Sequence, residues 1–181
     1  MPTVVAHRYA RALADVLAPT GNYRQVLGEL EDFSAAYHQS AELREVCETP
    51  AVPMAKKLGV LQALAGSLGS SHITANFLRV LMSHYRFPIL GEILLAFRNL
   101  AYARLGIVQV KITSAEALNR QERELLQARF NELTRKQSEL EFHRDGNLIG
   151  GLVAQIGSTV YDGSIRGHLD RIRERLTIGN L

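Results

Sequence analysis

The 181-residue sequence is poor in the features that mark disulfide-linked or membrane-spanning chains. It contains one cysteine, Cys47, which rules out an internal disulfide and indicates a reducing compartment. No uninterrupted apolar run reaches the roughly eighteen residues that a membrane span requires, and even the apolar run at residues 89–97 contains Glu92. Any attachment to a membrane is therefore expected to be indirect, through partner proteins.

Arrangements of side chains that carry catalysis or bind metals and cofactors are also missing. The six histidines are never three or four residues apart, so no helix can present a zinc-binding pair of the H-E-x-x-H type. No G-x-S-x-G nucleophile motif occurs. Gly157-Ser158 lacks the lysine that precedes the serine of a phosphate-binding loop. We therefore expect no catalytic residue, no metal and no cofactor, and a protein that is not an enzyme.

The charge of the chain is modest and unevenly distributed. The formal net charge is +3, with an acidic stretch between residues 22 and 48 and most of the positive excess after Arg98. A nucleic-acid-binding protein usually concentrates Lys and Arg on one face, and the sequence shows no clear concentration of that kind. The arginine series near the C-terminus suits a solvated helix face or contact with an acidic partner equally well.

Apolar residues recur at helical spacing through the first hundred or so residues. Thr3 and Ser40 suit the N-cap position of a helix, and Asn22 with Gln25 resembles a capping box. Turn-forming residues divide the pattern into six helices with short connections. The sequence therefore predicts a mainly α chain that begins with an N-terminal six-helix bundle over residues 1–105.

The hydrophobic period changes after this point. Residues 108–112 and 140–142 alternate between apolar and polar side chains, which is the spacing of β-strands. Between them, Asn119 and Glu122 open another helix. Its inner side is expected to carry Leu125, Leu126, Phe130 and Leu133. Residues 106–181 are thus predicted to form a small α+β C-terminal domain.

The C-terminal part of the sequence contains several turn and cap signals in close succession. Gly157-Ser158 separates two short β-prone runs as a two-residue hairpin loop, and Asp162 or Ser164 can cap the helix that follows. Gly150-Gly151 is interpreted as a packing or bulge position, because strand glycines usually mark a close approach of backbones. The apolar face of the final helix is predicted to contain Ile165, Leu169, Ile172 and Leu176.

The order of these motifs resembles the C-terminal signature of one family, the delta subunit of the rotary proton-translocating ATP synthase, called the oligomycin sensitivity-conferring protein in mitochondria. The motifs are Leu148-Ile149-Gly150-Gly151, Ile156-Gly157, Asp162-Gly163-Ser164 and Leu169. Further blocks resemble the family in the same order along the chain. They are Arg8-Tyr9-Ala10-Arg11-Ala12-Leu13, Pro53 with Lys56-Lys57-Leu58, residues 76–81 with Arg86 and Pro88, and residues 110–115. Ala14 departs from the family, whose members commonly carry a bulky residue there.

The resemblance implies a non-catalytic stator that holds the catalytic head still while a central shaft turns. The N-terminal domain would grip the N-terminal segments of the alpha subunits in a groove between its first and fifth helices. The groove residues expected from the resemblance and from the small-residue ridge of the first helix are Ala6, Tyr9, Ala10, Leu13, Asn76, Phe77 and Val80.

The C-terminal domain would hold the b-type subunits of the peripheral stalk. The residues expected at that end are Leu148, Ile149, Arg166, Leu169 and Arg173. The family membership that the resemblance suggests also implies a location at the cytoplasmic face of a bacterial cell membrane, reached only through the complex, and no nucleic-acid partner.

The alanine ridge, Phe77 and the function of the chain each have a second interpretation. The ridge of Ala6, Ala10 and Ala14 is explained equally well by close helix packing inside the bundle, and Phe77 is better explained as a core residue than as a groove residue. For function, the alternative is a basic adaptor that binds nucleic acid through its terminal helix, with strong dependence on salt.

Overall fold

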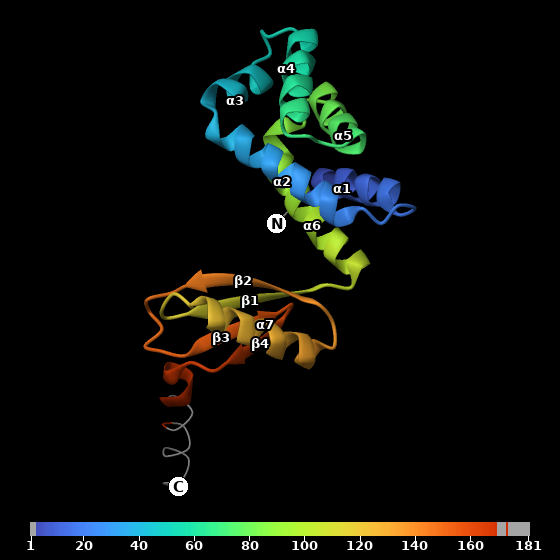
Figure 1. Ribbon diagram of the computed structural model, residues 1–181. Coiled ribbons are helices and arrows are strands. Elements are labelled where there is room, and N and C mark those ends of the chain that lie inside the picture. The colour runs from blue at the N-terminus through green and yellow to red at the C-terminus, as the bar shows by residue number, and fades with distance from the viewer. Residues whose placement is uncertain (1–2, 170–172, 174–181) are drawn as a thin grey trace. The chain divides into compact units, whose positions relative to one another are not determined.

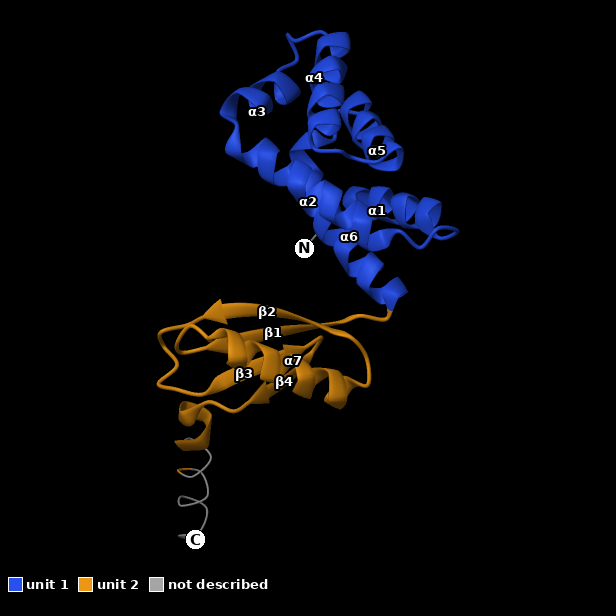
Figure 2. Cartoon of the chain, in the orientation of Figure 1, with its two compact units in different colours: residues 1–105 blue, residues 106–181 orange. Residues whose placement is uncertain are grey.

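The computed structural model describes residues 3–169 and residue 173. The chain forms two compact units, Met1–Leu105 and Gly106–Leu181 (Figure 2). The chain is mainly helical, and a small four-stranded sheet lies in the second unit (Figure 1). The predicted fold class, mainly α with a small C-terminal α+β part, is confirmed at this level.

The described part of the first unit contains six α-helices and one short 3-10 helix. They are α1 (Val4–Leu17), α2 (Tyr23–Gln39), α3 (Ala41–Glu48), α4 (Met54–Ser67), α5 (His72–Ser83), the 3-10 helix η1 (Phe87–Ile89) and α6 (Leu90–Leu105). The predicted caps of two helices are confirmed: Thr3 accepts from the backbone N–H of Ala6, and Ser40 from that of Leu43.

The capping box predicted for Asn22 and Gln25 is wrong. Asn22 has ψ 35°, outside the extended region usual for an N-cap, and makes no side-chain cap hydrogen bond, while Gln25 Nε2 donates to Glu29 Oε1 at 2.9 Å. The sixth predicted helix is preceded by a turn that is not α-helical. This turn is the 3-10 helix η1, which contains Pro88, a residue without a backbone N–H to donate.

The core of the first unit is built around α2, η1 and α6. The rings of Phe33 and Tyr37 on α2 meet the ring of Phe87 edge to face, with centroids 5.9 and 5.7 Å apart. Ile93 and Phe97 of α6 are fully buried in the same cluster. This core fixes α6 as the support against which α1 packs (Figure 1).

The second unit is a four-stranded sheet with strand order β2-β1-β3-β4. Its elements are β1 (Val108–Ser114), α7 (Arg120–Thr134), β2 (Ser138–Arg144), β3 (Leu152–Ile156) and β4 (Thr159–Asp162). β1 and β2 are parallel and are joined through α7, whereas β1 with β3, and β3 with β4, are antiparallel. Asn119 and Glu122 open α7 as predicted, and the structure shows that they form a capping box there.

α7 covers one face of this sheet (Figure 1), where Phe130 packs against Val110 and Ile112. The prediction for the inner side of α7 is right for Phe130 but wrong for Leu125 and Leu133, which are 62% and 59% exposed. The apolar residues of α7 extend over more of its circumference than a small sheet can cover, so two leucines are left facing solvent.

The hairpin and cap predicted near the C-terminus are confirmed. Gly157 has φ +58°, the positive value that the first residue of a Gly-first hairpin loop requires. Ser164 Oγ accepts from the backbone N–H of Gly167 at 3.0 Å, and Asp162 Oδ1 accepts from the N–H of Ser164 at 2.8 Å. Residues 165–169 are helical. The predicted positions Ile172 and Leu176 lie outside the described residues.

Gly151 permits a close approach between two backbones. Its φ is +80°, and a Cβ atom placed on it would lie 2.4 Å from the carbonyl oxygen of Gly163. The backbone N–H of Ile165 also donates to the carbonyl oxygen of Gly150 at 3.0 Å. The segment that precedes β3 is therefore tied to the start of the terminal helix, and the packing interpretation of the Gly-Gly pair is correct.

Candidate partner-docking surfaces

An open apolar groove of about 370 Å³ lies between α1 and α5 in the first unit. Its lining residues are Tyr9, Ala12, Leu13, Val16, Ile73, Asn76, Phe77 and Val80. Apolar and aromatic side chains dominate this set, and Asn76 is its one amide. The groove therefore suits apolar side chains of a partner better than a charged small molecule.

Exposure changes systematically across the groove. Leu13 is buried, and Tyr9 and Phe77 are half-buried with their inner sides against the core. Val16 on α1 and Val80 on α5 are 60% and 43% exposed. The groove thus has a floor anchored in the core and one exposed β-branched side chain on each wall, which is apolar surface that a partner can cover.

The polar side chains at the edge of the groove include no carboxylate. The ring of His84, the residue after α5, lies 6.5 Å from the ring of Tyr9. Arg79 Nη2 donates to Asn76 Oδ1 at 2.7 Å. No acidic residue is among those that line this groove. The edge therefore carries the Arg79 guanidinium and the floor is apolar, which favours an amphipathic segment with acidic or neutral polar flanks.

The α1 wall is fixed by two contacts with α6. At one end, the backbone N–H of Thr3 donates to Glu92 Oε2 at 2.8 Å, and this hydrogen bond holds the pKa of the Glu92 carboxyl below its ordinary value. At the other end, Arg104 Nη2 lies 3.1 Å from Asp15 Oδ1. The apolar packing of α1 on α6 lies between these two contacts.

The α5 wall is held by a carboxylate from α2. Glu29 Oε2 accepts from the backbone N–H of Ser71 at 3.0 Å, from Ser71 Oγ at 2.7 Å and from Thr74 Oγ1. Its other oxygen accepts from Gln25. Burial opposes ionisation of Glu29, but the hydrogen bonds from Thr74 and Ser71 outweigh it and hold the pKa of this carboxyl below its ordinary value.

Five of the seven residues predicted for the groove line it: Tyr9, Leu13, Asn76, Phe77 and Val80. The other two, Ala6 and Ala10, are 0% exposed and pack inside the unit. A fully buried side chain cannot contact a partner, so these two positions are a correction to the predicted groove. Of the two readings of the alanine ridge, close helix packing is the one that the structure supports.

Ala14 belongs to the same buried ridge. It is 1% exposed, it is not among the groove residues, and its carbonyl oxygen accepts from the hydroxyl of Tyr23 at 3.3 Å. The departure from the family at this position therefore affects the packing of α1 on its neighbours and does not change the lining of the groove.

Ala12, Val16 and Ile73 also line the groove, and none of them was among the predicted groove residues. A signal was present in α1, whose apolar residues cover too wide an arc for one interface. Its buried residues Ala6, Ala10, Leu13, Ala14 and Leu17 form one face. Tyr9, Ala12 and Val16 recur at i, i+3 and i+7 on an adjacent face, which is the one that meets the groove.

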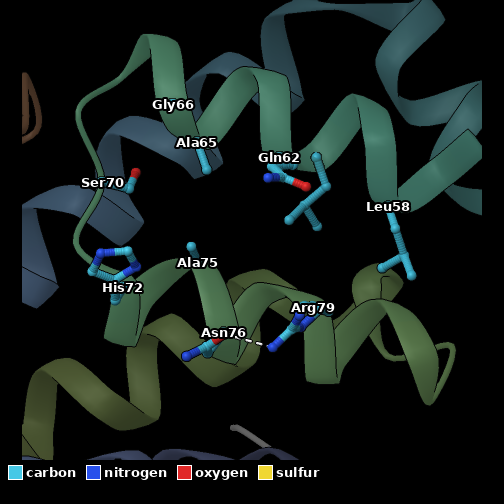
Figure 3. Close-up of a pocket in the computed structure, with 10 residues that line it drawn as sticks. Leu58, Gln62, Ala65, Gly66, Ser70, His72, Ala75, Asn76 and Arg79 are labelled. Atoms are coloured by element: carbon cyan, nitrogen blue, oxygen red, sulfur yellow. Dashed lines mark hydrogen bonds between the residues drawn. The ribbon is translucent and has the colours of Figure 1, made fainter. Parts of the chain in front are cut away.

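A second cleft, of about 460 Å³, lies between α4 and α5 (Figure 3). Its lining residues are Leu58, Leu61, Gln62, Ala65, Gly66, Ser70, His72, Ala75, Asn76 and Arg79. Asn76 lines both this cleft and the groove, and Figure 3 shows its hydrogen bond to Arg79. Ser70 Oγ is buried and has no hydrogen-bond partner among the described residues. The cleft is more polar than the groove.

The residues predicted for the stalk end lie on the surface of the second unit. Ile149 is exposed and Leu148 half-buried, and Arg166, Leu169 and Arg173 are exposed. The hydrogen bond between the Ile165 N–H and the Gly150 carbonyl brings the loop that carries Leu148 and Ile149 next to the start of the helix that carries Arg166 and Leu169. The structure adds exposed apolar side chains that the prediction missed, Val160 and Tyr161 of the strand β4 and Ile165 of the terminal helix.

The groove, the second cleft and the exposed surface of the second unit do not have the composition of a catalytic or metal site. Within residues 3–169 and at residue 173, no group of three or more His, Cys, Asp or Glu side chains is placed to hold a metal ion. The one thiol, Cys47, is buried, and burial raises its pKa. In the same part of the chain, no helix has the length and apolar character needed to span a bilayer.

Comparison with known proteins gives one family. The family model described as ATP synthase delta (OSCP) subunit matches residues 5–176. The chain is 43% identical over 174 residues to the ATP synthase subunit delta of Acidobacterium capsulatum, covering 96% of this chain and 97% of that protein. It is 38% identical over 176 residues to the ATP synthase subunit delta of Myxococcus xanthus, covering 95% and 96%.

A similar fold is found in a solved ATP synthase structure. A chain of the cryo-EM structure of the Toxoplasma gondii mitochondrial ATP synthase hexamer matches with a TM-score of 0.68 at 25% identity, covering 97% of this chain and 98% of that chain. The chain matches the family model and these relatives over nearly its full length. The chain belongs to the ATP synthase delta (OSCP) subunit family.

Proposed function

We propose that this chain is a non-catalytic connector in the stator of a proton-translocating ATP synthase. Its first unit docks on the catalytic head, and its second unit binds the b-type subunits of the peripheral stalk. The connection prevents the head from turning with the central shaft, so that proton flow drives ATP synthesis. The chain works at the cytoplasmic face of a bacterial cell membrane, which it reaches through the complex.

The observation that carries this proposal is the groove between α1 and α5. Its core-anchored floor and its exposed Val16 and Val80 form the kind of surface that receives the apolar face of a partner helix. The occupant that we propose is the N-terminal segment of an alpha subunit. The Arg79 guanidinium at the edge of the groove favours a helix with acidic flanks over a basic one.

The role of the second unit rests on its clustered surface. Ile149 and Leu169 expose apolar area outside the core under α7, and Arg166 is an exposed cation on the same terminal helix as Leu169. Contact with a stalk helix through apolar anchors and an arginine is consistent with the residues that dominate protein interfaces. We propose this surface, with Leu148 and Arg173, as the stalk-binding end.

The test is titration of the protein with a peptide that copies the N-terminus of the alpha subunit from the same organism. Val16→Asp and Val80→Asp place a charge on each groove wall at positions that are already exposed, so folding is retained. Each should weaken binding on the order of tenfold or more, because a carboxylate must lose water when the groove closes on the peptide. Val60→Asp, at an exposed position on α4 outside the groove, is the matched control and should bind normally.

A shortened protein tests whether the first unit alone binds the head and the second unit binds the stalk. A protein of residues 1–105 should fold alone, because the core around α2, η1 and α6 is complete within it. It should bind the alpha-subunit peptide as tightly as the full chain and should not bind the stalk subunits. A fragment that is aggregated or unfolded by circular dichroism would contradict the proposed division.

Nothing in the comparisons supports the alternative of a nucleic-acid adaptor. Every relative named above is an ATP synthase subunit delta, and the family model covers the terminal helix on which that alternative depends. We therefore retain only the stator proposal.

A further inference from the structure

We propose that Glu29 is a positioning residue for the groove: its carboxylate on α2 seats the N-terminus of α5 and so sets the distance between the two groove walls. This inference rests on the proposed docking function and adds to it a residue that lies outside the groove. Glu29 is not among the residues that line the groove.

The contact joins parts of the chain that are far apart in sequence. One carboxylate oxygen of Glu29 accepts from the backbone N–H and the hydroxyl of Ser71 and from the hydroxyl of Thr74, across separations of 42 and 45 residues. Ser71 is the N-cap of α5. Because these donors belong to the cap and first turn, the carboxylate fixes both the position and the direction of the helix start.

The negative charge of Glu29 faces the N-terminus of α5. No Lys, Arg or His of the described chain forms an ion pair with Glu29; its contacts are the hydroxyls and N–H of α5 and the amide of Gln25. The N-terminus of a helix carries a partial positive charge that favours a carboxylate. α5 itself therefore supplies the stabilisation, so the contact depends on the orientation of α5 as well as on its distance.

The groove is close to this contact. Ile73 lies in the first turn of α5 and Phe77 in the next, and both line the groove. The opposite wall, α1, is held separately by α6 through Thr3 with Glu92 and Asp15 with Arg104. A shift of the α5 start would therefore move one wall while the other stays in place. Ångström-scale misplacement of anchors is sufficient to lose much of the complementarity of a groove.

The chain contains a matched control for this idea. Glu31 lies two residues further along α2 and pairs with Arg98 of α6, with Oε1 2.7 Å from Nη2 and 3.1 Å from Nε. It has the same side chain on the same helix, but it contacts α6 in place of α5. Glu31→Gln should therefore disturb α2 without moving a wall of the groove.

The experiment measures the affinity of the wild type, Glu29→Gln, Glu29→Ala and Glu31→Gln for the alpha-subunit peptide, at a temperature where circular dichroism shows every protein fully folded. We expect both Glu29 variants to bind on the order of tenfold more weakly and Glu31→Gln to bind as the wild type does.

Methyl NMR of the free proteins is the second readout. The methyl signals of Ile73 and Val80 should shift in Glu29→Gln and stay in place in Glu31→Gln. Wild-type affinity in Glu29→Gln, equal losses in both Gln variants, or unshifted methyl signals would each overturn the positioning role. A wild-type protein that does not bind the peptide would contradict the docking function instead, and the methyl signals would still decide whether Glu29 seats α5.

Discussion

The Nζ atom of Lys57 lies 2.9 Å from the carbonyl oxygen of Cys47. Lys57 is 1% exposed and extends from α4 to the last turn of α3, where backbone carbonyls have no partner within the helix. Its ammonium also lies 5.7 Å from the centre of the Tyr85 ring. The buried cation thus connects the end of α3, the start of α4 and the turn after α5.

Because of this contact, we expect substitution of Lys57 to lower the free energy of unfolding more than substitution of its neighbour Lys56. Lys57→Met keeps most of the side-chain volume but leaves the Cys47 carbonyl without its donor, so the free energy of unfolding should fall by about 2 kcal/mol. Lys56→Met, at the exposed neighbouring position, should change it by less than about 0.5 kcal/mol. Urea denaturation of the two variants measures both values. Equal effects would show that the buried contact contributes nothing specific.

The glycines of the second unit give another paired prediction. Gly151→Ala must accept a positive φ and a contact with the Gly163 carbonyl, whereas Gly157→Ala must accept only a positive φ, because its Cβ would meet nothing within 4 Å. The first change should destabilise the unit by at least about 2 kcal/mol more than the second. Hydrogen exchange of the β3 amides can measure the difference. Comparable protection in the two variants would contradict the close backbone approach.

The stability of the first unit should depend on the ionisation of Glu29. The pKa of this carboxyl is held below its ordinary value of 4.5, so folding favours the ionised form. Its contribution is present above the pKa of the unfolded chain and is lost as the pH falls through the lower folded-state value. Between about pH 5 and pH 3, the free energy of unfolding of the wild type should therefore fall more steeply than that of Glu29→Gln. Parallel curves for the two proteins would contradict this assignment.

Features set by neighbouring residues were predictable from the sequence. The caps at Thr3 and Ser40 and the Gly157 hairpin depend on a few adjacent positions, and all three are present in the structure. The terminal cap by Ser164 follows the same logic. The alternating pattern of residues 108–112 also predicted β1 correctly.

Features set by distant partners were not predictable in the same way. Ala6 and Ala10 are buried because α6 covers that side of α1, and the apolar pattern of α1 alone does not say which of its two apolar faces is covered. The Asn22 capping box is absent, and Gln25 pairs with Glu29 instead. Glu29 lies in the acidic stretch of residues 22–48, and its contacts with α5 were not visible there because Ser71 and Thr74 are more than forty residues away.

ATP-driven proton pumping shows whether the chain holds the catalytic head in place without taking part in its chemistry. Membranes depleted of this protein should hydrolyse ATP but pump protons poorly, because the head is no longer held against rotation. Adding back the wild type should restore pumping, and adding back the double variant of Val16→Asp and Val80→Asp should not. Full proton pumping in membranes proven to lack the protein would contradict the stator account.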